Sequence, residues 1–107
     1  MPGLGTARAS LVTKTAQLPE VPLEAPAGPW GTTTIGSIQT GLVHGHVGAI
    51  AHLVDRMRAE LGADAPAVLT GGWSKFLRPL LSASYDWRPD LTIEGGRLIG
   101  ERAWAKL

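Results

Sequence analysis

Residues 66–73, Pro-Ala-Val-Leu-Thr-Gly-Gly-Trp, decide the fold class of this chain of 107 residues. The apolar run at 67–70 has the composition of a buried strand, and two glycines end it abruptly. The segments that follow predict a short helix over 73–81 and a second strand over 84–87. Because strands that alternate with helices usually pair in parallel, we expect an α/β layer with a small parallel sheet.

On the N-terminal side of this stretch, a long helical pattern runs from 35 to 61. Threonines 32–34 offer hydroxyl N-caps to this helix, and Gly62 is a natural stop. The helical period of about 100° per residue gathers apolar side chains on one face, which we expect to lie in the core. This face consists of Ile35, Ile38, Leu42, Ala49, Ile50, Leu53 and Met57.

A strip without side chains, formed by Gly41, Gly45 and Gly48, runs beside the apolar face. Each glycine costs a helix about 1 kcal/mol relative to alanine. Three glycines in two turns therefore indicate that another backbone or a ligand comes close to this strip. A bend of the helix near Gly45 is the alternative.

Shorter elements complete the predicted order. A helix is expected over 1–17, and four prolines make 18–31 an extended connector, with a short edge strand over 21–23. Asp90 is placed to cap a last helix that carries Leu91, Leu98 and Ile99 on one side. Residues 32–107 thus read as helix, strand, helix, strand, helix.

The composition excludes several classes of function. Ten Lys and Arg against nine Asp and Glu leave a net charge of +1, without the basic surface that nucleic acid or an anionic membrane requires. The absence of cysteine excludes disulfides, thiolate zinc sites and thiol nucleophiles. No apolar run is long enough to span a bilayer. We expect a cytoplasmic protein with neither nucleic acid nor membrane as a partner.

Two places could bind a ligand. The turn after the first strand, Thr70, Gly71 and Gly72, lies where α/β folds bind nucleotides, although such a glycine pair is more often only a turn. The N-terminus of the long helix, at threonines 32–34, attracts polar ligands and anions, although capping by one threonine explains most of the pattern.

Other polar and aromatic residues favour structural roles. His44, His46 and His52 lie on three sides of the long helix, so they cannot bind one metal ion together. We expect the carboxylates of Asp86, Asp90 and Glu94 to lie in a solvated turn and at a helix cap. The four tryptophans are expected to pack in the core or an interface.

Several segments match one family in order and spacing. The chain resembles the C-terminal half of type III pantothenate kinases, which belong to the acetate-kinase/actin-like superfamily and phosphorylate pantothenate at the first step of coenzyme A synthesis. The matching segments are Pro2-Gly3, Thr15-Ala16-Gln17-Leu18-Pro19 with Val21, Gly31-x-x-Thr34, Ile38-Gln39-x-Gly41 with Gly45 and Gly48, Thr70-Gly71-Gly72, and Pro89-Asp90-Leu91-Thr92-x-Glu94-Gly95.

The resemblance implies a fold and a set of sites. It implies a single lobe, residues 1–107, of an actin-like/ribonuclease H-like kinase fold, helix-rich with one long glycine-striped helix. Thr34 would contact pantothenate, and Thr70, Gly71 and Gly72 would border the adenosine of ATP. The long helix would serve a homodimer interface or the crevice between lobes. Magnesium and a monovalent cation, potassium or ammonium, are implied as well, with no ligand in this chain.

The chain also departs from the family pattern. Thr33 stands where Asn or Ser is common, His44 and His46 lie near positions that are often aromatic, and Gly96 replaces a usual leucine. The Asp-x-Gly-Asn-Thr phosphate loop and the Gly-x-Asp-Arg segment with the catalytic aspartate do not occur in these 107 residues. We therefore expect a fragment that lacks the catalytic half of the kinase and is inactive alone.

Two other functions fit the sequence. The first is a non-catalytic module that binds a nucleotide or forms a dimer, which would be a stable, monodisperse oligomer. The second is a small transcriptional regulator, which the nearly neutral charge makes improbable.

Overall fold

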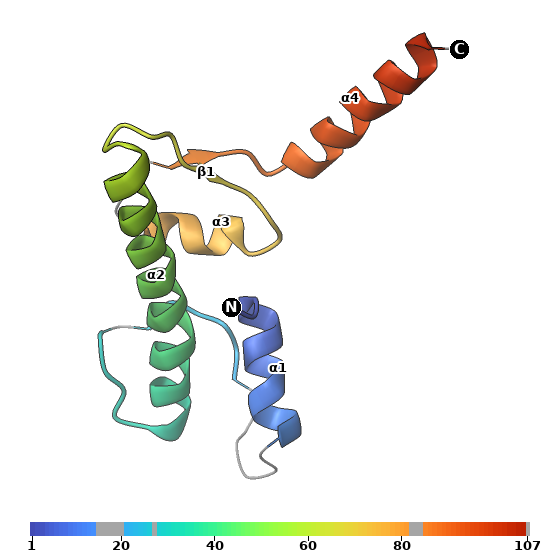
Figure 1. Ribbon diagram of the computed structural model, residues 1–107. Helices are drawn as coiled ribbons and strands as arrows, with labels where there is room; N and C mark the ends of the chain where they lie inside the picture. Colours follow the sequence, from blue (N-terminus) through green and yellow to red (C-terminus); the bar gives the residue numbers. More distant parts are fainter. Residues whose placement is uncertain (15–20, 27, 82–84, 107) are drawn as a thin grey trace. The chain divides into compact units, whose positions relative to one another are not determined.

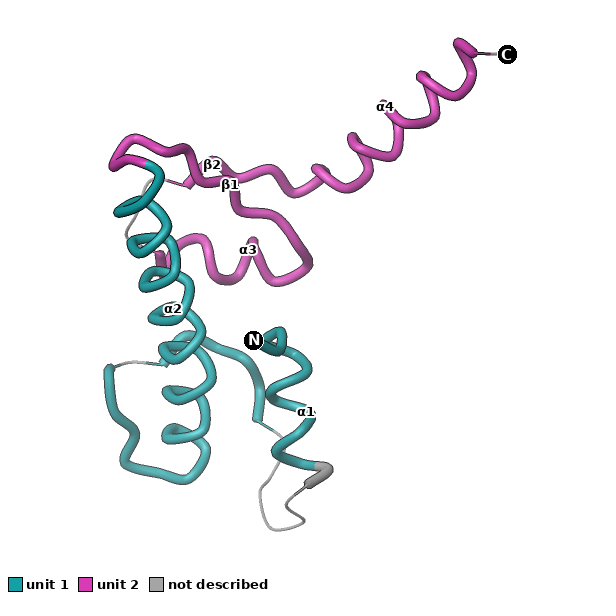
Figure 2. The backbone as a smooth tube through the Cα atoms, in the orientation of Figure 1, with its two compact units in different colours: residues 1–61 teal, residues 62–107 magenta. Residues whose placement is uncertain are grey.

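The computed structural model describes residues 1–14, 21–26, 28–81 and 85–106. The chain divides into two compact units, Met1–Leu61 and Gly62–Leu107, and each is considered by itself (Figure 2). Helices predominate in the described residues, and two short strands form a small sheet (Figure 1). The elements are α1 (Leu4–Lys14), α2 (Thr34–Leu61), β1 (Val68–Leu69), α3 (Ser74–Leu77), the 3-10 helix η1 (Arg78–Leu80), β2 (Asp86–Trp87) and α4 (Leu91–Ala105).

In the first unit, α1 packs beside α2 (Figure 1). The buried apolar side chains come from α1, from the connector and from the middle of α2: Leu4, Val21, Leu42 and Val43. Gln39 links α2 to the connector, because its side-chain amide donates a hydrogen bond to Pro22 O at 3.0 Å. Among the described residues 21–26 no strand forms, so the expected edge strand is wrong there, but Val21 is buried.

His46 holds the start of the chain against α2. Its Nδ1 lies 2.9 Å from Leu42 O and its Nε2 lies 3.0 Å from Pro2 O. A carbonyl oxygen can only accept a hydrogen bond, so the ring nitrogen that carries a proton is the donor. The motif residue Pro2 is thereby placed beside His46, in the fourth turn of α2.

The ends of α2 confirm the predicted long helix. The Gly36 N–H donates to Thr33 Oγ1 at 3.0 Å, which makes Thr33 the N-cap. Gly62 has a φ of +117°, a left-handed conformation that glycine adopts without a steric penalty, and it ends the helix.

The expected core face of α2 is only partly buried. Leu42 lies in the core, whereas Ile35 and Leu53 are exposed and Met57 is 58% exposed. The cause is length: at 1.5 Å per residue, α1 with 11 residues spans about 17 Å and α2 with 28 residues about 42 Å, so α1 covers only part of α2. The fully buried Val43 lies outside the predicted face.

The glycine strip has no close neighbour among the described residues. A Cβ added at Gly41, Gly45 or Gly48 would meet nothing within 4 Å. No other backbone segment of the described residues therefore lies against this strip. Helix α2 is assigned without a break from Thr34 to Leu61, so the glycines do not interrupt it.

In the second unit, β1 and β2 pair in parallel, as predicted, with Val68 opposite Asp86 and Leu69 opposite Trp87. Side chains of paired residues lie on the same face of a sheet, and Trp87 is bonded to α3 through Ser74. Leu69 therefore faces the side that α3 covers, whereas Val68 faces the other side and is 50% exposed. The expectation of a fully buried strand is wrong for Val68. Residues 82–84, including predicted strand residue Ser84, lie outside the described residues.

The predicted helix over 73–81 is divided. The α-helical part is only α3, and the chain continues as η1, which contains Pro79. Proline has no N–H to donate to a preceding turn, so the α-helix cannot continue through it. Helix α4 follows Asp90 as predicted, but the Asp90 side chain forms no capping hydrogen bond.

Helix α4 has no buried residue, and Leu91, Leu98 and Ile99 are all exposed. An ion pair between Arg97 and Glu101, at 2.6 Å, links successive turns of its surface. No helix in the described residues is long and apolar enough to cross a membrane.

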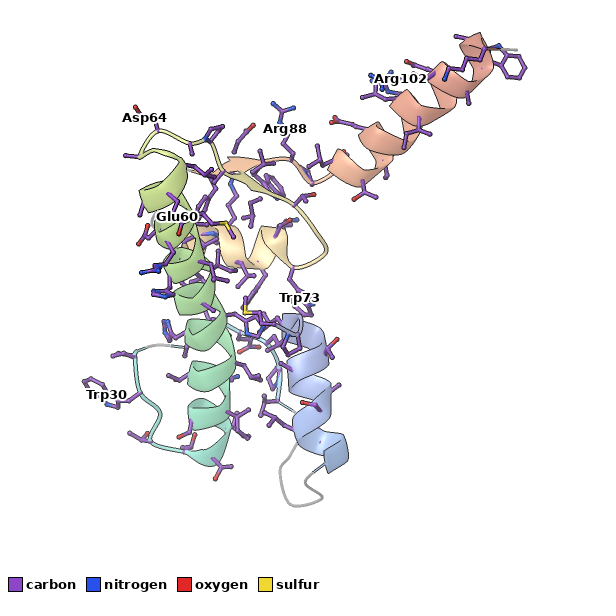
Figure 3. All side chains as sticks on the ribbon, in the orientation of Figure 1. Trp30, Glu60, Asp64, Trp73, Arg88 and Arg102 are labelled. Atoms are coloured by element: carbon purple, nitrogen blue, oxygen red, sulfur yellow. The ribbon has the colours of Figure 1, made fainter. Side chains whose placement is uncertain are left out.

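Two of the four tryptophans lie outside the core. Trp30 and Trp104 are each more than three-quarters exposed, and Trp30 points away from α2 (Figure 3). Trp73 meets Phe76 edge to face, with ring centroids 6.0 Å apart.

Candidate functional site

The turn after β1 is held by a chain of hydrogen bonds. The Ser74 N–H donates to Gly71 O at 3.1 Å, and the Ser74 hydroxyl donates to the same oxygen at 2.6 Å. Trp87 Nε1 in turn donates to Ser74 Oγ at 3.0 Å. Since Ser74 is buried and uses its hydroxyl as both donor and acceptor, it joins the turn to strand β2. The sequence did not single out Ser74, and the only signal for it is its position directly after the glycine turn.

The backbone of this turn is open to a ligand. Gly71 has a φ of +105°, which a residue with a side chain rarely adopts. A Cβ added at Gly71 or Gly72 would meet nothing within 4 Å, and Thr70 is exposed beside them. A nucleotide could therefore approach the main chain without meeting a side chain.

The second candidate, Thr34, is the first residue of α2 and is exposed. Its hydroxyl makes no hydrogen bond with a described residue, whereas Thr33 is occupied by capping. The family residues Asn and Ser at this position are also good N-caps, so the departure at Thr33 preserves the cap. Thr34, like the exposed Thr32, thus has a hydroxyl that no described residue occupies.

The structure shows why the Gly31-x-x-Thr34 motif begins with a glycine. A Cβ at Gly31 would lie 2.3 Å from Ser37 N and 2.4 Å from Gly36 C. The connector therefore crosses the first turn of α2 so closely that only glycine fits. The sequence showed the motif but not this contact.

Thr34 belongs to the first unit and the turn at 70–72 to the second (Figure 2). The structure therefore describes each candidate site within its own unit. Among the described residues, no group of three or more His, Cys, Asp or Glu could hold a metal ion.

Sequence reasoning also missed a pocket of about 390 Å³ in the second unit, lined by Lys75, Arg78, Pro79 and Trp87. The Arg78 guanidinium carbon lies 4.6 Å from the centroid of the Trp87 ring. The spacing of Lys75 and Arg78 could have indicated a common helix face, but only the fold brings Trp87 to it.

The observed arrangement defines a helix-rich α/β protein in which a parallel strand leads through a glycine turn into a helix. A family model described as type III pantothenate kinase matches residues 1–56. The chain belongs to the type III pantothenate kinase family.

Individual relatives extend the match across the rest of the chain. The type III pantothenate kinase of Dehalococcoides mccartyi strain CBDB1 is 37% identical over 98 residues, which cover 92% of this chain and 37% of the relative. The enzyme of the same name from Moorella thermoacetica is 36% identical, covering 94% and 40%. That of Roseiflexus sp. strain RS-1 is 39% identical, covering 94% and 39%. The chain thus spans about two-fifths of the length of these curated relatives.

Proposed function

We propose that this chain is the C-terminal part of a pantothenate kinase-like protein, which uses ATP to phosphorylate pantothenate to 4'-phosphopantothenate in coenzyme A synthesis. The observation that carries this proposal is the similarity to type III pantothenate kinases over 92–94% of the chain, which includes most or all of the candidate residues. The exposed glycine turn and the available Thr34 hydroxyl support it.

In this proposal Thr34 contacts pantothenate, and Thr70, Gly71 and Gly72 border the adenosine of ATP. A threonine hydroxyl can donate to or accept from the polar groups of pantothenate. The glycine turn suits a bulky, flat group that must approach the main chain. Both roles are binding roles, and they place the substrates without performing the chemistry.

Phosphoryl transfer also needs groups that neutralise the charge of the transferred phosphate and position the attacking hydroxyl. The phosphate loop and the catalytic aspartate segment of the family have no counterpart in these 107 residues. We therefore propose that the chain alone is inactive and that the other part of the kinase must supply these groups.

A coupled assay tests this proposal in two steps. The 107-residue chain is first incubated with ATP and pantothenate, and no turnover above background is expected. The part of the Dehalococcoides mccartyi relative that this chain does not match is then added as a separate polypeptide, and turnover is expected. Robust turnover by the chain alone would refute the proposed inactivity. Absence of turnover from a folded two-part complex would refute the proposed kinase function.

The open glycine strip supports a second role, which is the formation of a homodimer through α2. Gly41, Gly45 and Gly48 leave space along the helix where a second helix could pack closely. Sedimentation of the chain tests this role. A monodisperse dimer that dissociates when bulky residues replace these glycines would support it, and a monomer at all concentrations would exclude it.

A further inference from the structure

We propose that the pocket on α3, η1 and β2 binds a small organic anion whose carboxylate or phosphate group is attached to an apolar body. The pocket measures about 390 Å³, within the range of ligand sites, and all of its lining residues belong to the second unit. Neither Thr34 nor the glycine turn lines it, so this site goes beyond the proposed kinase function.

Two positive charges that form no ion pair among the described residues point to an anion. Lys75 and Arg78 are three residues apart, so they lie on one side of the helical segment. Neither forms an ion pair with a carboxylate of the described residues. Asp86, which precedes the pocket residue Trp87, is already paired with Arg88 at 2.9 Å. An anion in the pocket would therefore meet uncompensated charge.

Arg78 is ordered before a ligand arrives. Its guanidinium lies over the Trp87 indole at 4.6 Å, a distance typical of a cation–π contact. The indole is itself held by the 3.0 Å hydrogen bond to Ser74, whose hydroxyl is bonded to Gly71 O. A guanidinium held over the indole can still donate from two of its N–H groups to two oxygens of one anion. Less side-chain freedom is then lost on binding.

The rest of the lining favours an apolar body on that anion. The Trp87 and Pro79 rings are apolar, and the long side chains of Lys75 and Arg78 contribute aliphatic stems below their charged groups. An inorganic ion would use the charges alone. An aromatic carboxylate or phosphate would use both the charges and the apolar surface, so it should bind more tightly.

The test is a titration of the uniformly ¹⁵N-labelled chain, followed through the indole N–H signals of its four tryptophans. Trp87→Phe identifies the Trp87 signal. Phenyl phosphate and benzoate serve as probes. Inorganic phosphate is the control without an apolar body, and benzyl alcohol is the control without a charge. We expect saturable shifts centred on Trp87, and tighter binding of phenyl phosphate or benzoate than of either control probe. Whichever of the two aromatic anions binds more tightly shows whether the pocket prefers a phosphate or a carboxylate group.

Charge-removing variants make the test specific. The double variant Lys75→Met, Arg78→Met keeps the aliphatic stems and should weaken binding at least ~10-fold, since hydrogen bonds to charged groups are the stronger kind. Arg102→Met removes a charge from the exposed surface of α4 (Figure 3) and should leave binding unchanged. Equal shifts at all tryptophans, wild-type binding by the double variant, or equal weakening by Arg102→Met would each overturn the proposal. So would inorganic phosphate binding as tightly as phenyl phosphate.

Discussion

Replacing Gly31 by alanine should destabilise the first unit. The new Cβ would lie 2.3 Å from Ser37 N, 2.4 Å from Gly36 C and 2.7 Å from Ser37 Cα. Ordinary contacts of this kind begin near 3.5 Å, so the connector or the first helical turn must move by about 1 Å. All three clashing atoms are main-chain atoms of a helix, and they cannot rotate away as the end of a side chain could.

The expected cost follows from what this movement disrupts. Overpacking a well-packed site typically costs about 1–3 kcal/mol. Moving the connector also disturbs the Thr33 hydroxyl that caps α2 at 3.0 Å from Gly36 N, and loss of an N-cap costs about 1 kcal/mol. We therefore expect Gly31→Ala to lower the free energy of unfolding by about 2 kcal/mol or more.

Urea denaturation followed by circular dichroism at about 222 nm measures this change in the free energy of unfolding. The m-value should be the same for the variant and the unmodified chain. Gly28→Ala is the matched control, because a Cβ at Gly28 meets nothing within 4 Å and the residue lies in the same connector. The control should stay within about 0.5 kcal/mol of the unmodified chain. If Gly31→Ala is as stable as Gly28→Ala, the connector does not cross α2 as described, and the structural explanation of the Gly31-x-x-Thr34 motif is wrong.

Four further substitutions test the cap, the turn and the proposed sites. Thr33→Ala should cost about 1 kcal/mol and lower the melting temperature by several degrees, whereas Thr33→Asn should restore it, both measured by thermal unfolding. Gly71→Val should lower the free energy of unfolding by about 1–3 kcal/mol, because the φ of +105° at Gly71 suits only glycine. The same variant should raise the apparent KM for ATP in the two-part assay. Gly72 has no positive φ, so Gly72→Ala should unfold like the parent chain. Gly45→Ala should stabilise the isolated helix by about 1 kcal/mol but weaken any dimer formed through α2, which sedimentation would reveal as dissociation. Thr34→Val should raise the KM for pantothenate in the same assay with little change in kcat, and unchanged kinetics would remove this residue from the site.

Features with a local physical cause could be predicted from the sequence. A threonine hydroxyl caps the helix that directly follows it, and Gly62 ends that helix because of its own backbone freedom. The two parallel strands were likewise predictable, because a strand, a glycine turn and a helix follow one another within a few residues. The extent of α3 was missed, although Pro79 was visible, because whether a helix continues as a 3-10 turn depends on its surroundings.

What packs against what had to come from the tertiary structure. The period of α2 predicted an apolar face that includes Met57, but in the structure Val43 is buried while Met57 is exposed. Similarly, the glycine of the Gly31-x-x-Thr34 motif is required by a crossing of two main-chain segments that no spacing reveals.

The candidate sites divide in the same way. The glycine turn and Thr34 were identified from the sequence, through local chemistry and a family resemblance. The pocket at Arg78 and Trp87 was not, because the two residues are nine positions apart in the chain and the parallel pairing of β1 with β2 sets where Trp87 lies. By itself, the sequence determined the helices, the turn and the family, since each rests on neighbouring residues or on their order. Only the tertiary structure decided which faces remain open and where charge meets an aromatic ring, because these depend on contacts between residues that are not neighbours in the chain.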